Sequence, residues 1–298
     1  MLTRWTKSTM LLLMGVALMY GQNVTILAIK GDVQVEQAGG WQKATAGMKL
    51  SESQKIKLGA QSYAALVSST NKTRELRQPG VYTLSQLFAQ ATEDNAYASR
   101  YTGYLTNQAI ASGGGRASGK TLGAVTRSTM APTPRVPAQT AFYPDRILLS
   151  WERVPNPEGY IIEILDEAGQ VVYNTQVPPD KNFVEINSEN KFKSGVCYYW
   201  HVSTRRHASL RSTNLCFRLL TPEQVANLRK EEESLRRSLD LNTALGQAIL
   251  GGFYEMNGMY AYALDAYTQA TNLEPGTDGY IALRDGLIDR VVRQPVSE

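Results

Sequence analysis

The chain has 298 residues, of which 43% are hydrophobic and 19% charged, and its formal net charge is +4. This length suits two or three globular domains, and the composition is that of a folded chain. Two histidines and two cysteines are too few for a zinc site with several such ligands, an iron–sulfur cluster or a disulfide-dense scaffold. No apolar run reaches the roughly 18 residues that a membrane-spanning helix needs.

The first residues have the pattern of an export signal. Two basic residues, Arg4 and Lys7, precede an apolar stretch from Met10 to Tyr20, and Gly21 then offers a small-residue cleavage point. We expect residues 1–21 to be a signal peptide and the mature chain to begin near Gln22, in an oxidising compartment such as a bacterial periplasm. A buried N-terminal helix is the alternative.

Charge is distributed unevenly along the chain. Residues 22–140 carry 13 basic and 6 acidic side chains, residues 141–220 carry 9 of each, and residues 221–298 carry 7 basic and 12 acidic ones. A basic N-terminal half suits an anionic cell-wall polymer or an acidic partner, although we favour a merely solvated surface. Export and the lack of a basic–aromatic motif argue against nucleic acid.

Residues 22–84 are predicted to form short strands, because apolar or alternating runs are separated by turn residues. The order of these elements resembles the FecR domain of bacterial envelope proteins. The residues that carry the resemblance are Gly31-Asp32-Val33, Trp41 to Leu50, Ile56 to Gly59, Ser62 to Val67 and Pro79 to Tyr82. In FecR-type sensors such a domain follows a membrane span and a cytoplasmic anti-sigma segment. The sequence has neither pattern, so we do not expect the sigma-factor regulatory role here.

Helical spacing follows over residues 85–111, and residues 112–140 have the Gly, Ser, Thr and Pro content of a linker. Within it, Gly114 to Thr121 matches the phosphate-loop pattern, and Asp166 stands where a magnesium-binding carboxylate could follow a strand. That motif requires a buried strand before it and a helix after it. Here a helical stretch precedes it and three prolines follow, so we favour a flexible linker at a domain boundary and expect no cofactor.

Residues 141–220 are predicted to be a second β region. They resemble a fibronectin type III or related immunoglobulin-like sandwich, and such modules usually mediate adhesion or act as spacers. The match rests on Trp151, on Tyr160, Ile162 and Ile164 in alternation, and on Tyr198, Trp200 and Val202 in alternation.

Alternation also orients the two cysteines. If Trp200 faces the core, Cys197 faces outward with His201, and if Phe217 faces inward, Cys216 faces outward as well. Two cysteines on one face of adjacent antiparallel strands are able to form a cross-strand disulfide, which we expect here. Two free thiols, or a catalytic cysteine–histidine pair without a third group to orient it, are the alternatives.

The C-terminal third, residues 221–298, is predicted to be helical. Thr221, Pro222 and Glu223 supply an N-cap, a proline at the first helical position and an acidic first turn for a helix to about Leu239. In this helix, Glu231-Glu232-Glu233 is expected to be a solvated face.

Residues 244–277 resemble a tetratricopeptide repeat (TPR), although Gln247 replaces the usual aromatic residue. The packing positions are Leu250, Gly251, Tyr254, Gly258, Ala263, Tyr267, Ala270 and Pro275. A single repeat cannot bury its apolar face alone, so helices at 222–239 and 279–292 are expected to cap it. We expect Tyr260 and Tyr262 to be exposed and to bind a peptide or partner helix, and a self-packed bundle is the alternative.

The sequence therefore predicts a multidomain β + α protein. Its parts are a small all-β FecR-like domain, an immunoglobulin/fibronectin-like β-sandwich and a C-terminal TPR-like α-helical hairpin with flanking helices. No catalytic, cofactor-binding or metal-ligating constellation emerges. We expect a non-enzymatic periplasmic or envelope adaptor or scaffold that holds an envelope protein partner. The alternative is a protein that binds cell-envelope glycan (peptidoglycan), or a weak cell-wall hydrolase, since carboxylates paired in space are invisible in sequence.

Overall fold

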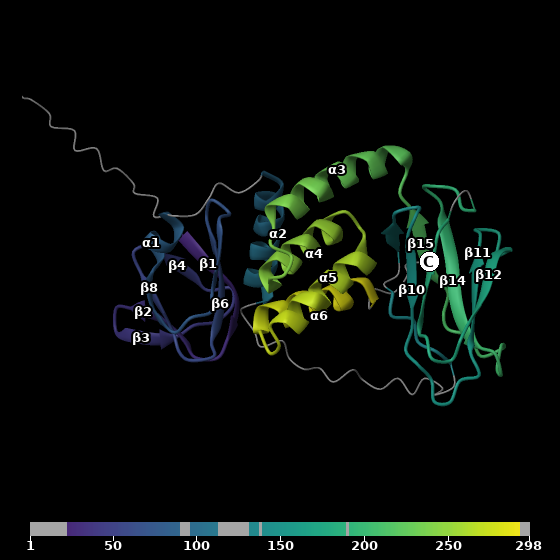
Figure 1. The fold of residues 1–298 in the computed structure, drawn as a ribbon, viewed down its shortest axis with the longest axis horizontal. Coiled ribbons are helices and arrows are strands. Elements are labelled where there is room, and N and C mark those ends of the chain that lie inside the picture. Colours follow the sequence, from purple (N-terminus) through teal and green to yellow (C-terminus); the bar gives the residue numbers. More distant parts are fainter. Residues whose placement is uncertain (1–22, 90–95, 113–130, 137–138, 189–190, 293–298) are drawn as a thin grey trace, which may run out of the picture.

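The computed structural model describes residues 23–89, 96–112, 131–136, 139–188 and 191–292, and in it a block of helices lies between two β modules (Figure 1). The expected signal peptide at residues 1–21 and the phosphate-loop-like segment at residues 114–121 lie outside the described residues. Among the described helices, none has the length and apolar character needed to cross a membrane.

The N-terminal β module consists of two four-stranded antiparallel sheets, with the strand orders β4-β1-β6-β7 and β3-β2-β5-β8. Inward-facing apolar residues such as Val35, Ile56 and Leu66 fill the core between the sheets. The elements are β1 (Asn23–Lys30), β2 (Val33–Gln37), β3 (Gly40–Lys43), β4 (Lys49–Ser51), β5 (Lys55–Leu58), β6 (Tyr63–Ser68), β7 (Thr73–Leu76), β8 (Gly80–Thr83) and the short helix α1 (Leu84–Ala89).

Strands β1 and β6 are buried on both faces. Every residue of β6 is buried, and so is every residue of β1 from Val24 to Ile29. Such consecutive apolar runs, without alternation, are typical of strands that are covered on both sides. One face meets the second sheet, and the other contributes to the core of the helical block through Leu27, Ala28, Tyr63, Ala65 and Val67. The N-terminal module and the helical block therefore share a hydrophobic core.

The helical block contains one helix more than the C-terminal third supplies. Its helices are α2 (Ala96–Ser112), α3 (Pro222–Ser238), α4 (Ala244–Met256), α5 (Tyr260–Leu273) and α6 (Asp278–Val292). The helix expected at 85–111 is thus described as α1 and α2, and α2 packs against α3, α4, α6 and β1. A capping box starts α3: Thr221 accepts a hydrogen bond from the Gln224 amide and donates its own amide to the Gln224 side chain.

Glycines allow the closest contacts of this block. A Cβ atom on Gly251 would lie 2.4 Å from Cε1 of Tyr267, so only glycine lets α4 and α5 approach as they do. A Cβ atom on Gly279, near the start of α6, would lie 2.1 Å from the carbonyl oxygen of Leu27 in β1. The N-terminal turn of α6 therefore rests directly on the sheet.

The second β module is a sandwich of a five-stranded sheet, with the order β12-β11-β14-β15-β9, and a two-stranded sheet of β10 and β13. Trp151, Tyr160 and Trp200 are fully buried in its core. The strands are β9 (Thr140–Phe142), β10 (Ile147–Ser150), β11 (Tyr160–Leu165), β12 (Val171–Val177), β13 (Phe183–Ile186), β14 (Cys197–Thr204) and β15 (Leu215–Leu219).

The sandwich begins before residue 141, so the expected linker is too long at its C-terminal end. Pro134 forms a bridge with Trp151, the Arg135 amide donates to the Ser150 carbonyl at 2.8 Å, and Val136 is buried in the sandwich core. Strand β9 then pairs in parallel with β15, and its Ala141 amide donates to the carbonyl of Gly258 at 2.8 Å. The turn between α4 and α5 is therefore bonded to the edge of the sandwich.

Candidate functional site

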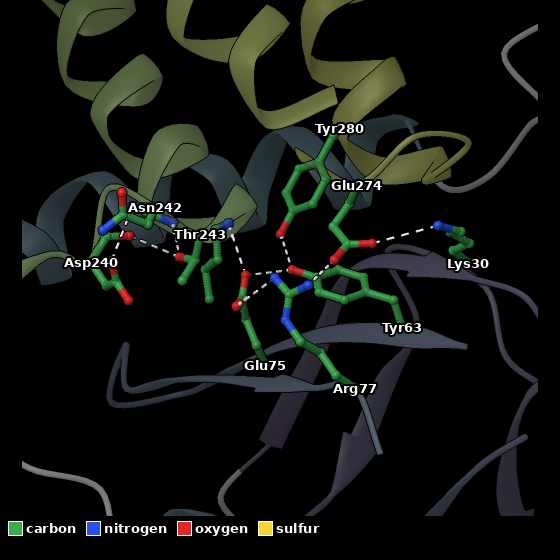
Figure 2. A network of polar contacts seen from close by, with 11 residues as sticks. Lys30, Tyr63, Glu75, Arg77, Asp240, Asn242, Thr243, Glu274 and Tyr280 are labelled. Atoms are coloured by element: carbon green, nitrogen blue, oxygen red, sulfur yellow. Dashed lines mark hydrogen bonds and ion pairs between the residues drawn. The ribbon is translucent and has the colours of Figure 1, made fainter. Parts of the chain in front are cut away.

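A network of polar contacts lies where the N-terminal module meets the helical block (Figure 2). We call it the seam network and define it as Lys30, Tyr63, Glu75, Arg77, Glu274 and Tyr280. The first four residues come from β1, β6 and the region of β7, whereas Glu274 follows α5 and Tyr280 lies in α6. Residues about 200 positions apart in the chain thus meet in one cluster, for example Arg77 and Glu274, separated by 197 residues.

Glu75 is the centre of the seam network. Its Oε1 accepts hydrogen bonds from the Tyr63 hydroxyl at 2.6 Å and from the Leu245 amide at 3.0 Å, and its Oε2 lies 3.2 Å from Nη2 of Arg77. Leu245 is in the first turn of α4, which Thr243 caps by accepting from the Gly246 amide. The carboxylate therefore lies at the positive end of the α4 dipole and satisfies an amide that has no partner within the helix.

The charges of the network balance. Arg77 bridges Glu75 and Glu274, and Lys30 lies 3.6 Å from the other Glu274 oxygen. The hydroxyls of Tyr63 and Tyr280 are 2.6 Å apart, and the guanidinium of Arg77 lies 5.1 Å from the Tyr63 ring centre. Two largely buried carboxylates thus face two partly exposed cations, and this pairing offsets part of the cost of removing the carboxylates from water.

Burial raises the pKa of Tyr63, and the neighbouring Tyr280 and Glu75 raise it further. Burial likewise raises the pKa of Tyr280 well above its ordinary value. Both hydroxyls therefore keep their protons at neutral pH and act as hydrogen-bond partners. Both oxygens of Glu75 are also bonded, so the seam network joins the N-terminal module to the helical block.

A hollow of about 220 Å³ adjoins the network between β7 and the α3–α4 connection. It is smaller than the roughly 300–1,000 Å³ of most small-molecule sites. Its lining includes Thr73, Arg74, Glu75, Asp240 and Thr243. Its one network member, Glu75, is already bonded on both oxygens. In the part of the chain that the structure describes, no group of three or more His, Cys, Asp or Glu residues is placed to hold a metal ion.

Tyrosine–glutamate pairs also join the other elements of the block. The hydroxyls and carboxylates lie 2.5 to 2.8 Å apart in the pairs Tyr101–Glu231, Tyr143–Glu232, Tyr254–Glu232 and Tyr267–Glu255. These pairs connect α2 to α3, the sandwich to α3, α3 to α4, and α4 to α5. The solvated face expected at residues 231–233 is therefore wrong for Glu231 and Glu232, whose side chains are 14% and 15% exposed, and right for Glu233 at 65%.

The structure confirms the disulfide expected from strand alternation. Cys197 on β14 is bonded to Cys216 on β15, with their Cα atoms 5.9 Å apart, inside the range that disulfides span. The bond runs diagonally, because Cys197 is opposite Arg218 and Cys216 is opposite Tyr199. His201, expected on the same exposed face, is instead buried, with Nε2 2.9 Å from a Glu163 oxygen.

Tyr262 is not the exposed docking residue that we expected, because the sandwich covers it. Its hydroxyl donates to the carbonyl of Arg146 at 2.6 Å, and its ring centre lies 5.7 Å from that of Phe142 and 5.3 Å from that of Tyr254. Tyr260 is half-buried and packs on the helical core. The expectation failed because the covering surface comes from residues more than 100 positions earlier in the chain.

The eight expected packing positions of the helical hairpin lie on α4, α5 and their turns. Seven of them occupy α4, the following turn or α5: Leu250, Gly251, Tyr254, Gly258, Ala263, Tyr267 and Ala270. Pro275 comes two residues after the end of α5. Gly258 has a φ of 68°, which suits glycine at the turn. Tyr267 packs against Gly251, whereas Tyr254 reaches α3 and bonds with Glu232 and Arg236.

Comparison with known proteins gives likenesses of structure alone. No family model matches the sequence, and no curated protein matches it. The fibronectin type III domain of the human collagen alpha-1(XX) chain is similar at 20% identity over 30% of this chain and 86% of that chain, with a TM-score of 0.25. The FN1–FN3 domains of chicken CNTN1 are similar at 12% identity over 67% of this chain, with a TM-score of 0.26. This second match spans 57% of the chicken chain, little more than half of its length.

Proposed function

We propose that this chain is a non-enzymatic, exported envelope adaptor, in which the helical block holds two β modules in a fixed relation. The observation that supports this most is the shared core: side chains of β1 and β6 belong to the same cluster as those of the helices. On the opposite side, Tyr262 and the Gly258 carbonyl attach the block to the sandwich. A rigid body of this kind suits a scaffold, because partners bound to its two ends keep a fixed spacing.

The modules keep their proposed family likenesses. We infer a FecR-like domain in residues 23–84, since strands occur over the runs that carried that resemblance. A fibronectin III-like sandwich is inferred for residues 131–220, since Trp151 and Trp200 fill its core. Helices α4 and α5 are inferred to be a TPR-like hairpin, which α2, α3 and α6 flank.

Export is supported by the Cys197–Cys216 disulfide, because such bonds persist in oxidising compartments such as the periplasm. The N-terminal signal pattern agrees with that location. We therefore place the protein in the periplasm or on the outer envelope.

The sandwich exposes apolar side chains that we propose as contacts for an envelope protein partner. Val171, Val172 and Phe183 are 50%, 43% and 48% exposed on β12 and β13. Strand β12 is the edge of its sheet, so it carries unpaired backbone groups as well as apolar side chains. Exposed apolar side chains on an edge strand are typical of protein contact surfaces.

In-cell photo-crosslinking tests the adaptor proposal. A photoreactive residue at Val172 is expected to capture one discrete envelope protein, whereas the same residue at the covered Tyr262 is expected to capture none. Capture at Tyr262 alone, or at neither position, would overturn the proposed partner surface. Turnover of purified peptidoglycan by the pure mature protein would overturn the non-enzymatic part and favour the weak cell-wall hydrolase.

A further inference from the structure

One sheet of the N-terminal module has an outer face that the helical block leaves uncovered. The sheet β4-β1-β6-β7 lies against the helices, whereas β2, β3 and β8 lie on the side away from them (Figure 1). The sheet β3-β2-β5-β8 thus covers the module core with one face and leaves the other available.

Strand register identifies the side chains on this outer face. Val33 and Val35 are buried in the core, so the alternate residues of β2, Gln34 and Glu36, face outward. On the neighbouring strands, Lys43 and Lys57 lie opposite Gln34, and Trp41 lies opposite Glu36. Val81 lies opposite Lys57 and Thr83 opposite Lys55, so all of these residues share the outer face. We call this surface the Trp41 face and define it by Gln34, Glu36, Trp41, Lys43, Lys55, Lys57, Val81 and Thr83.

Trp41 gives this face an aromatic platform. Its side chain is 40% exposed, although tryptophan is mostly buried in folded proteins, and Val81 is 55% exposed on the same face. Nζ of Lys57 on β5 lies over the Trp41 ring, 5.8 Å from its centre, so the ring extends from β3 across β2 and one side of it meets this cation. An exposed indole offers a flat, electron-rich surface on which the C–H face of a sugar ring is able to stack.

The charge of the Trp41 face is positive. Three lysines stand against Glu36, which is already paired with Lys55 at 3.5 Å, and against Asp32 just before β2, whose Oδ1 accepts from Gln34 Nε2 at 3.0 Å, so one positive charge is in excess. Lys43 on β3 and Lys57 on β5 both lie opposite Gln34, one on each side of β2. Since they are two strands apart, they lie about 10 Å from each other. The amide nitrogen of Gln34 donates to Asp32, and its amide oxygen is able to accept a hydrogen bond from a sugar hydroxyl, as is the Thr83 hydroxyl.

We infer that the Trp41 face binds a carboxylate-bearing polysaccharide, with a sugar ring on Trp41 and carboxylates on Lys43 and Lys57. The inference rests on the proposed function only in placing the protein in the envelope, where such polymers occur. An aromatic ring alone fits a neutral glycan, and lysines alone fit any polyanion. The two together, on a sheet face that the described helices leave exposed, select an acidic glycan.

Binding of the full mature chain to immobilised polygalacturonate, a polymer of carboxylated sugars, tests this inference. We expect binding that weakens as salt rises, because screened lysine charges contribute to it. W41A is expected to weaken binding at least fivefold, and the double variant K43Q/K57Q is expected to weaken it at least fivefold with a smaller salt dependence. The matched controls are Y199A and K181Q in the sandwich, both at exposed positions, which should bind as the wild type does. Melting curves of all variants show whether each is folded.

Two comparison polymers separate the inference from its alternatives. Polyglutamate carries the carboxylates without sugar rings, and dextran carries sugar rings without charge. Binding to polygalacturonate well above both, with loss in W41A, supports the inference. Equal binding to polyglutamate with no effect of W41A would overturn it in favour of an acidic protein partner. No binding to polygalacturonate would overturn it too, while leaving the capture at Val172 as a separate test of the adaptor.

Discussion

Glu75 connects three elements through one carboxylate. It contacts Tyr63 of β6, the Leu245 amide at the start of α4, and Arg77, which itself holds Glu274 after α5. A hydrogen-bonded carboxylate at a helix N-terminus is favourable both for its bonds and for the helix dipole. The side chain therefore stabilises the seam between the N-terminal module and the helical block.

The substitution Glu75→Gln tests this role. It removes the charge that Arg77 and the α4 N-terminus face, and it turns an amide donor toward groups that also donate. We expect the free energy of unfolding to fall by about 1–3 kcal/mol, measured by urea denaturation. Glu233→Gln is the control, because it alters an exposed pair on α3 that contributes about 0.5 kcal/mol or less. A Glu75 variant as stable as the Glu233 variant would show that the seam network does not stabilise the contact between the N-terminal module and the helical block.

Gly251 and Gly252 are adjacent but differ in the room beside them. A Cβ on Gly251 would lie 2.4 Å from the Tyr267 ring, whereas a Cβ on Gly252 would lie 3.3 Å from the Leu105 side chain. Tyr267 cannot move freely, because it is fully buried and its hydroxyl bonds with Glu255.

We expect Gly251→Ala to lower the free energy of unfolding by about 1–3 kcal/mol through overpacking. Gly252→Ala should raise the free energy of unfolding by about 1 kcal/mol through the higher helix propensity of alanine, and this gain offsets the cost of the milder contact with Leu105. Thermal melts of the two variants side by side provide the comparison. If Gly252→Ala melts below Gly251→Ala, the close α4–α5 contact is not what limits the choice of residue at position 251.

For strands and helices, the sequence predicts what depends on local periodicity. Alternation on β14 and β15 was enough to predict the Cys197–Cys216 bond, because a strand has only two faces. The apolar runs Ile26–Ile29 in β1 and Tyr63–Val67 in β6 carry a further signal, burial on both faces. The role of α2 and the burial of Tyr262 could not be predicted, because both depend on surfaces supplied by remote parts of the chain.

The disulfide is expected to stabilise the sandwich through the unfolded chain. It closes a loop between residues separated by 19 positions, for which loop-closure entropy gives about 3 kcal/mol. The double variant Cys197→Ser/Cys216→Ser should therefore be less stable by about 2–4 kcal/mol under oxidising conditions. With a reductant present, the wild type and the variant should melt together. A variant that matches the oxidised wild type would contradict a structural role for the bond.

The buried tyrosines predict a steep loss of stability of the folded chain in alkali. Burial raises the pKa of Tyr63, Tyr267 and Tyr280 above the ordinary value that each regains on unfolding. A group whose pKa is raised in the folded state stabilises the fold fully at pH values below its pKa in the unfolded chain, which is about 10 for tyrosine. This stabilisation is lost as the pH rises above that value. Above about pH 10, each of the three tyrosines should lower the free energy of unfolding by about 1.4 kcal/mol per pH unit.

Alkaline titration followed by far-ultraviolet circular dichroism and by tyrosinate absorbance checks this prediction. We expect a cooperative loss of helix above about pH 10, accompanied by a step in tyrosinate absorbance as the buried hydroxyls ionise on unfolding. Ionisation of every tyrosine before any loss of helix would contradict the burial of Tyr63, Tyr267 and Tyr280.

The fixed relation of the two β modules is the claim on which the adaptor proposal depends. Spin labels at Lys43→Cys on β3 and Gln176→Cys on β12 report the distance between the two ends of the molecule, since both side chains are exposed and both native cysteines are bonded. Double electron–electron resonance on this labelled chain should give one narrow distance distribution. A broad or multiple distribution would show that the modules move independently and would contradict the rigid scaffold.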